Sequence, residues 1–186
     1  MTRNLNTEIS NYALLVFLGA IWAASFVAIK FSNLIFNPIE VGFYRTFIGS
    51  IFLFLAVKLR GGSISLFSEN TRIYSLIGFL NASVPFTLLP YGLITLPSNI
   101  GVIILSANPF LALVLAHFFT LDEKLSLRKV IGSIIGFSGV VFAVGVEIFV
   151  SDWDSLISAI AIYVGASSYV ISNLIIRRIS HLPSDM

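Results

Sequence analysis

Residues 73–121 read IYSLIGFLNASVPFTLLPYGLITLPSNIGVIILSANPFLALVLAHFFTL and contain no aspartate, glutamate, lysine or arginine. A helix needs only about 20 apolar residues to cross a lipid bilayer. An uncharged stretch of this length is therefore predicted to cross the membrane twice. The break between the two crossings is predicted at residues 95–99, TLPSN, because Pro97 suits the first turn of a new helix.

The composition of the whole chain also indicates a membrane protein. Hydrophobic residues make up 57% and charged residues 11% of the sequence, and its mean hydropathy is +0.97. Soluble domains contain about 25% charged residues, so this chain has too little polar surface for a water-soluble fold. The net charge of +2 does not indicate nucleic-acid binding, since no basic run is long enough to form a patch.

Cofactor and metal chemistry is not expected from these residues. The chain has no cysteine, which excludes a disulfide framework, thiol catalysis and a thiolate metal site. Two histidines and no dense carboxylate cluster leave few ligands for a metal ion. An enzyme is disfavoured, and no cofactor is predicted.

Working outward from residues 73–121, four further apolar stretches are long enough to cross the membrane. The predicted fold is therefore an all-α integral membrane bundle of six transmembrane helices. The four flanking spans are predicted at residues 11–29, 38–57, 127–146 and 156–176.

Basic residues gather in alternate gaps between these spans, which is typical of loops on the cytoplasmic side. The third gap has no charged residue, and the fifth contains only acids, Glu147, Asp152 and Asp154. Both ends of the chain, including residues 1–10, are therefore predicted to be cytoplasmic, with the protein in the cell membrane. The basic residues concerned are Arg3, then Lys58, Arg60 and Arg72, then Lys124, Arg128 and Lys129, and finally Arg177 and Arg178.

A cleaved signal peptide is the alternative interpretation of the first span. Small residues between Gly19 and Ala24 resemble a cleavage site. However, Arg3 is balanced by Glu8, and the apolar run is long for a signal peptide. The spanning helix is the favoured interpretation.

Small residues recur on one face of each of the last two spans. In lipid, close approach of helix backbones at small residues drives helix packing. These faces are therefore predicted to be packing surfaces of a compact bundle rather than contacts for a substrate. Their members are Gly132, Gly136, Gly139 and Ala143 on the fifth span, and Ala161, Gly165, Ser168 and Ser172 on the sixth.

Charges inside the spans are scarcer and more informative. Arg45 lies about two turns into the second span, where a charged side chain costs a few kcal/mol. Glu40, five positions earlier, lies on a different helix face and is a poor partner for it. Lys30 ends the first span at a similar depth. If Arg45 and Lys30 point inward, they form a cationic end suited to a carboxylate or phosphate, whereas the alternative is that both snorkel to the interface.

Polar, aromatic and proline residues within the spans indicate a cavity. Trp22 lies mid-span, away from the interfacial belt that Trp usually occupies. Pro85, Pro90 and Pro109 interrupt the third and fourth spans, and each frees a backbone carbonyl that lipid cannot satisfy. Such kinks must face protein or a wet cavity, and both are common in transporters.

The segment from Trp22 to Lys30, WAASFVAIK, resembles the first-helix W-G-x-x-F-x-x-x-K pattern of EamA-type permeases in the drug/metabolite transporter superfamily. It departs from that pattern at Ala23, where the family often has glycine. The resemblance covers residues 12–146, one five-helix repeat. Further matching positions, in chain order, are Arg45, Asn108, Pro109, Glu123, Gly132 and Gly139.

The resemblance implies ten helices in two repeats. Residues 11–146 would form the first EamA repeat and residues 155–186 the start of a second, inverted repeat, since an odd number of crossings turns the second copy over. Ser168-Tyr169-Val170 echoes Ser25-Phe26-Val27, and residues 182–185, LPSD, echo residues 37–40, NPIE. The chain is interpreted as a partial permease that lacks its second half. A short variant that restores its helices as a homodimer is the alternative.

The predicted function is that of a secondary transporter, which moves small polar metabolites such as amino acids across the membrane by alternating access. No segment resembles a phosphate-binding loop, so an ATP-driven motor is not expected. The alternatives are a non-transporting membrane subunit and a flippase of lipid-linked sugars. The expected partners are a small-molecule substrate and the lipid bilayer, and the predicted substrate-binding residues are Trp22, Ser25, Lys30, Arg45, Asn81 and Tyr91.

Overall fold

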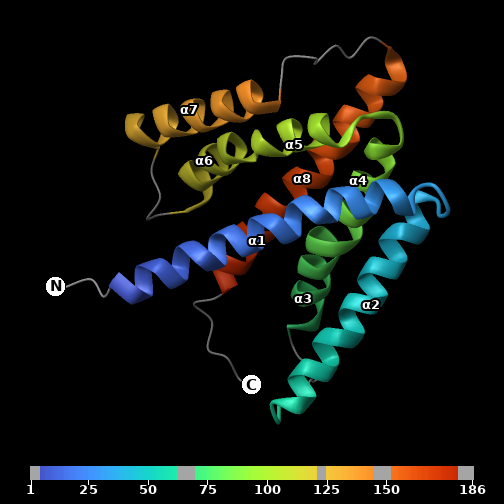
Figure 1. The fold of residues 1–186 in the computed structure, drawn as a ribbon. Coiled ribbons are helices and arrows are strands. Elements are labelled where there is room, and N and C mark those ends of the chain that lie inside the picture. The colour runs from blue at the N-terminus through green and yellow to red at the C-terminus, as the bar shows by residue number, and fades with distance from the viewer. Residues whose placement is uncertain (1–4, 63–69, 121–124, 145–151, 180–186) are drawn as a thin grey trace.

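The computed structural model describes residues 5–62, 70–120, 125–144 and 152–179, and within these ranges every regular element is a helix. Figure 1 shows these helices in chain order. The charged residues Arg3, Glu123, Lys124 and Glu147, the side chain of Glu8 and the 182–185 echo lie outside the described residues. The helices are α1 (Leu5–Ser32), α2 (Pro38–Leu59), α3 (Thr71–Gly78), η1 (Phe79–Ser83), α4 (Val84–Thr95), α5 (Ser98–Ser106), α6 (Asn108–Phe119), α7 (Leu127–Val144) and α8 (Trp153–Ile179).

Five helical stretches within the described ranges are long and apolar enough to cross a membrane, and each coincides with a predicted crossing. The remaining predicted span, 127–146, coincides with α7, a helix of 18 residues that is not one of these five. A crossing by α7 therefore stays a prediction. The five stretches are Ser10–Ser32, Pro38–Leu59, Thr71–Thr95, Ser98–Phe119 and Trp153–Ile179.

The third span is one continuous run built from α3, η1 and α4. Its centre is a π turn, in which the N–H of Val84 donates to the carbonyl of Phe79. Pro85 follows in the first turn of α4, and Pro90 lies inside that helix. The prolines were predicted to interrupt this span, and the structure has a π turn directly before Pro85. Such wide turns are frequent at functional sites.

The predicted break between the third and fourth spans is confirmed. Helix α4 ends at Thr95 and α5 begins at Ser98, with Pro97 at the N-cap position in extended conformation. The fourth span has a second break at Ala107, between α5 and α6, and Pro109 lies in the first turn of α6. This agrees with the predicted kink at Pro109.

The tightest packing in the molecule joins α4 to α8. A Cβ atom at Gly92 would lie 2.6 Å from the carbonyl oxygen of Ser158, and one at Gly165 would lie 2.9 Å from Leu89 Cδ1. Leu93 and Ile162 between them are fully buried. The predicted packing face of the sixth span is therefore confirmed: Gly165, Ser168 and Ser172 are buried, and Ala161 is half-buried.

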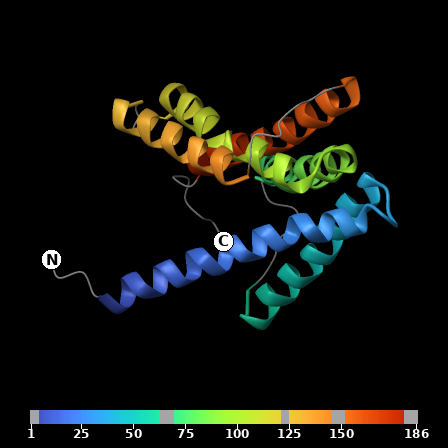
Figure 2. The same cartoon turned by 45° about the horizontal axis from the view of Figure 1, so that its top comes forward.

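The predicted packing face of the fifth span is wrong for its three glycines. Gly132, Gly136 and Gly139 are exposed, and nothing lies within 4 Å of a Cβ atom placed on them; the Ala143 side chain lies outside the description. Helix α7 instead contacts α5 and α6 beside this face, through the edge-to-face pair of Phe137 and Phe110 with ring centroids 5.7 Å apart. Aromatic rings bury more area than glycines, which explains why they determine the contact. Figure 2 shows α7 alongside α6.

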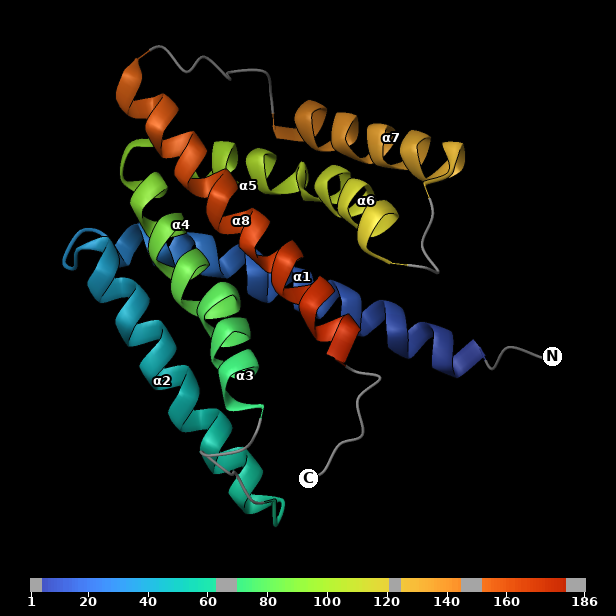
Figure 3. The ribbon, with the colours of Figure 1, turned by 180° about the vertical axis from the view of Figure 1, so that it is seen from behind.

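Helices α1 and α8 run in opposite directions across the molecule (Figures 1 and 3). Helix α8 crosses the face of the molecule that is seen from behind in Figure 3, and it contacts α3, η1, α4, α5 and α6. These contacts bring α8 to the cavity described next.

Candidate functional site

A cavity of about 920 Å³ lies between α1, η1, α5, α6 and α8. Its volume is within the range typical of small-molecule sites. Five elements that are distant in the sequence therefore meet around one space. The cavity is lined by Gly19, Trp22, Ala23, Phe26, Asn81, Val102, Leu105, Ser106, Asn108, Pro109, Ala112, Tyr169, Val170 and Asn173.

Two of the predicted site residues line this cavity. Trp22 contributes from α1, one turn before Phe26, and Asn81 contributes from the π turn η1. A wide turn alters the direction in which side chains leave the helix, so η1 affects where the Asn81 amide lies.

Ser25 and Arg45 are brought together beside the cavity. Arg45 Nη2 donates to Ser25 Oγ over 3.4 Å, and the guanidinium carbon lies 4.2 Å from the centre of the Phe86 ring. A cation over an aromatic face is stabilised by the ring quadrupole. Arg45 Nη1 is buried and has no hydrogen-bond partner among the described residues. Arg45 and Phe86 also line a groove of about 710 Å³ at the end of α1.

Tyr169, which was not among the predicted site residues, connects the Arg45 cluster to the cavity. Its side chain lines the cavity and interacts electrostatically with Arg45. Asn173, one turn later on α8, lines the same wall. The signal for Tyr169 was present in the sequence, because Ser168-Tyr169 echoes Ser25-Phe26 and Phe26 lines the cavity from α1.

Lys30 and Tyr91 are not brought to the cavity or to the Arg45 groove. Lys30 lies in the last turn of α1, and Tyr91 lies on α4 with 44% of its surface exposed. Neither residue lines either space. The cationic pair of Lys30 and Arg45 is therefore not assembled in this conformation.

Glu40 has a structural role at the start of α2. Its carboxylate accepts the N–H of Asn37 over 2.9 Å, while Asn37 Oδ1 accepts the N–H groups of Ile39 and Glu40. This capping box satisfies donors that the first turn would otherwise leave free. Glu40 thus caps its own helix, in agreement with the expectation that it is a poor partner for Arg45.

Asn108, which belongs to the family pattern and to the polar residues within the spans, joins two helices at the cavity wall. Its Nδ2 donates to the carbonyl of Ala166 on α8 over 3.0 Å, and its Oδ1 is buried with no hydrogen-bond partner among the described residues. Asn33 has the same arrangement, with Nδ2 donating to the carbonyl of Pro90 over 2.8 Å. Side-chain hydrogen bonds of this kind hold membrane helices together.

The cavity wall carries no formal charge. The residues that line it include no aspartate, glutamate, lysine, arginine or histidine, and their polar side-chain groups are asparagine amides, the Ser106 hydroxyl, the Tyr169 phenol and the Trp22 indole N–H. An unpaired ion is expensive to bury in such a site. Aromatic rings of Trp22, Phe26 and Tyr169 supply flat apolar surface. No group of metal-ligating side chains occurs among the residues that the structure describes.

These spans and this partly open cavity define a multi-pass membrane protein with a pocket between its helices. The profile of the EamA-like transporter family matches residues 10–145, and the chain belongs to that family. The resemblance found in the sequence is thereby confirmed. The family is one of transporters and not of enzymes, in agreement with the prediction that the chain is not an enzyme.

Two relatives show the same similarity. A Bacillus subtilis (strain 168) protein named "Uncharacterized transporter YoaV" is 27% identical over 154 residues, which cover 83% of this chain and 52% of that protein. An Archaeoglobus fulgidus protein named "Uncharacterized transporter" is 31% identical over 120 residues, covering 64% of this chain and 42% of its own length. The chain thus matches about half the length of these relatives. No solved structure matches it.

Proposed function

We propose that this protein is a secondary transporter, which moves small polar metabolites across the cell membrane by alternating access. The observation that carries the proposal is the cavity of about 920 Å³ between five helical elements. A cavity that draws on many helices can open to either side when those helices move against one another. The helix break at Ala107 and the π turn η1 lie at the wall of this cavity. At these points the helices could bend when the cavity opens to one side or the other.

The cavity favours a solute without net charge, including a zwitterion such as an amino acid. Its lining offers amide and hydroxyl groups beside three aromatic rings but no counter-ion. Arg45 interacts electrostatically with Tyr169 and can attract a carboxylate toward that end of the cavity. Trp22, Asn81, Ser25 and Arg45 are the proposed substrate contacts.

Lys30 and Tyr91 remain in the proposal as contacts of a second conformation. Alternating access requires at least two arrangements of the helices, and the ends of α1 and α4 are where Lys30 and Tyr91 lie. In that second conformation Lys30 and Arg45 would both bind an anionic group of the substrate. Substitutions at these two positions test this part separately.

The proposed organisation is a cytoplasmic segment at residues 1–10, a five-helix repeat at 11–146 and the start of an inverted repeat at 155–186. The opposite directions of α1 and α8 support it (Figures 1 and 3). So does the presence of Phe26 and Tyr169, which occupy echoed sequence positions, at the same cavity. The complete transporter would then have ten helices in one chain, or twelve in a homodimer of this six-span chain.

Transport by the full-length protein in proteoliposomes tests the proposal. Uptake would be measured with a panel of labelled neutral amino acids, dicarboxylates and polyols, with and without a proton gradient. We expect gradient-dependent uptake of neutral amino acids, lowered by Trp22→Ala and Asn81→Leu. Phe52→Ala, on the exposed face of α2, is the control and should leave uptake unchanged.

The outcome also separates the two alternatives. A flippase would move a fluorescent lipid-linked sugar between leaflets but no soluble solute. A non-transporting subunit would do neither, and Trp22→Ala would then alter no flux.

A further inference from the structure

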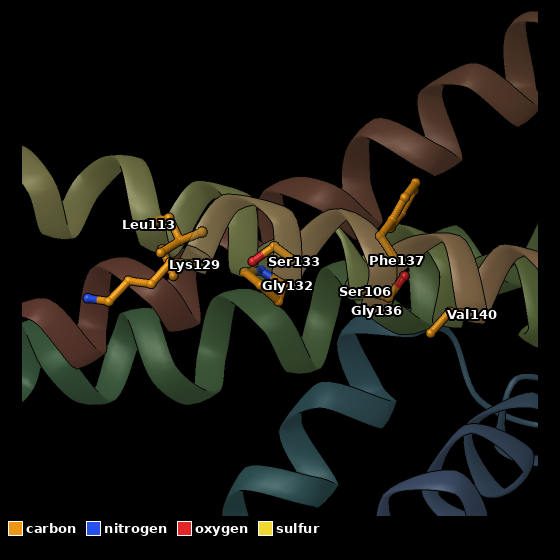
Figure 4. A pocket seen from close by; sticks show the side chains of 10 residues that line it. Ser106, Leu113, Lys129, Gly132, Ser133, Gly136, Phe137 and Val140 are labelled. Atoms are coloured by element: carbon orange, nitrogen blue, oxygen red, sulfur yellow. The ribbon is translucent and has the colours of Figure 1, made fainter. Parts of the chain in front are cut away.

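A second hollow, which shares the lining residues Ser106, Pro109 and Ala112 with the cavity, runs along α7. It is a groove of about 680 Å³ between α7 and the helices α5 and α6. Figure 4 shows its α7 residues in order from Lys129 to Val140, with Leu113 and Ser106 contributed by the helices behind. The groove is lined by Ser106, Pro109, Ala112, Leu113, Lys129, Gly132, Ser133, Gly136, Phe137 and Val140.

Glycines on α7 keep this groove open. Nothing lies within 4 Å of a Cβ atom placed at Gly132 or Gly136, so neither position is filled by a neighbouring helix. Leu113 and Phe137 form apolar walls beside them. The groove is therefore a mostly apolar channel along the helix axis.

The groove has one charged end. Lys129 lines it near the beginning of α7, next to the exposed Arg128, and Val140 lines it toward the other end. Eleven positions separate Lys129 from Val140, which is about 16 Å along a helix. One leaflet of a bilayer has a hydrocarbon depth of about 15 Å, half of the whole core. The apolar groove is thus about as long as one leaflet is deep, and the Lys129 ammonium group lies at one end of it.

We infer that this groove binds one acyl chain of an anionic phospholipid, with the lipid phosphate at Lys129. Because the groove is about as long as one leaflet is deep, a lipid whose acyl chain fills the groove would have its headgroup at the membrane surface. Lys and Arg attract anionic lipids there. A transmembrane helix, about 10 Å across, could enter this open groove with the side chains of one face only. An acyl chain is much thinner and can follow the glycine floor of the groove.

Lipid retention by the full-length protein tests the inference. The protein would be placed in nanodiscs with equal amounts of phosphatidylglycerol and phosphatidylcholine, and the lipid it retains on extraction would be counted by native mass spectrometry. We expect preferential retention of phosphatidylglycerol. Lys129→Gln should lower this preference about fivefold, the effect of removing one surface charge. Gly136→Leu should abolish retention by filling the groove.

Gly139→Leu is the matched control. Gly139 is exposed on the same helix with open space around it, but it does not line the groove. Retention by this variant should equal that of the wild type. Equal retention of both lipids by the wild type would overturn the inference, and so would full retention by Gly136→Leu, because the headgroup would then bind without the groove.

A second measurement decides the question if Gly136→Leu fails to fold. The 186 residues contain no cysteine, so Val140→Cys can carry a fluorophore at a chosen site. Phosphatidylglycerol with a quencher near the chain terminus should quench this label at least twofold more than the equivalent phosphatidylcholine. Equal quenching by the two lipids would contradict a bound acyl chain.

Discussion

Arg45 Nη2 lies 3.4 Å from Ser25 Oγ, and this contact ties α2 to α1 within the membrane. The same guanidinium lies over the ring of Phe86 on α4, so three spans meet at one cation. An arginine at this depth is expensive unless protein groups surround it. The cluster therefore fixes the relative positions of α1, α2 and α4 at the edge of the cavity.

Replacing Arg45 should impair transport more than it impairs folding. A hydrogen bond from the Arg45 guanidinium to a solute carboxylate would contribute about 1.5–3 kcal/mol to binding, so Arg45→Met should lower the initial uptake rate at low solute concentration about tenfold or more. Arg45→Lys should recover only part of this loss, because an ammonium lacks the planar fork of donors. Rates would be corrected for the amount of protein in the membrane. Arg60→Met, at the exposed end of α2, should transport normally, and a normal rate for Arg45→Met would refute the role.

Gly92 should tolerate no side chain. A Cβ atom there would lie 2.6 Å from the backbone oxygen of Ser158, which cannot move without displacing α8. We expect Gly92→Ala to destabilise the protein by about 1–3 kcal/mol, as overpacking does. Unfolding in mixed detergent and SDS micelles measures this. Gly139→Ala is the control, because open space surrounds Gly139 and alanine favours the helix.

The hydrogen bond from Asn108 to Ala166 should make a small contribution to stability. Bonds of this type contribute about 0.6 kcal/mol on average in a membrane protein. Asn108→Leu should thus cost less than about 1 kcal/mol, since it also removes the unpartnered Oδ1. Asn108→Asp should cost more at neutral pH, because a carboxylate has no N–H to donate to the Ala166 carbonyl. The same unfolding assay would compare the two variants, and equal losses would contradict this assignment.

Asp152 should give the beginning of α8 an acid-sensitive cap. Hydrogen bonds from the side chain and the backbone N–H of Ser155 hold the pKa of Asp152 below its usual range, and the backbone bond is 2.8 Å long. The stabilisation is therefore complete above the unfolded pKa of about 3.9 and is lost as the pH falls through the lower folded value. Hydrogen exchange at the Ser155 amide should accelerate there, beyond the intrinsic pH effect. Asp152→Asn keeps the acceptor and should remove this dependence.

Single cysteines should report the proposed topology in intact cells. Leu34→Cys and Asn99→Cys lie in the gaps predicted to face outward, whereas Gly62→Cys and Leu125→Cys lie in the basic gaps. A membrane-impermeant maleimide should label the first pair and label the second pair only after permeabilisation. Labelling of Gly62→Cys and Leu125→Cys from opposite sides would reject the arrangement.

Much of the helix layout could be predicted because its causes are local. Asn37 and Pro38 mark the start of α2, and Pro97 marks the break before α5, through capping and the missing N–H of proline. The packing face of α8 followed from residue size, since Gly165 and Ser172 are small at helical spacing. These signals act within a few residues, so they need no tertiary structure.

The rest depends on which faces of the helices meet, and that is not encoded locally. Tyr91 is exposed on α4 because Leu89, Gly92 and Leu93 contact α8 instead. Tyr169 reaches the cavity because α8 packs against η1, α5 and α6, which form the other walls of that cavity. The glycines of α7 have the same spacing as the packed face of α8, so spacing alone could not distinguish an open groove from a helix contact.

The wide turn at Phe79–Ser83 has a consequence for the length of the third span. Each residue of a regular helix advances the side-chain direction by about 100°. A π turn contains about one residue more than an α turn, so deleting one amino acid from this five-residue segment would restore regular winding and leave α3 close to its present angle relative to α4. The contact between Ser172 and the Ile77 carbonyl should therefore survive this deletion, whereas a deletion within the regular part of α4 would rotate α3 by about 100° and break it.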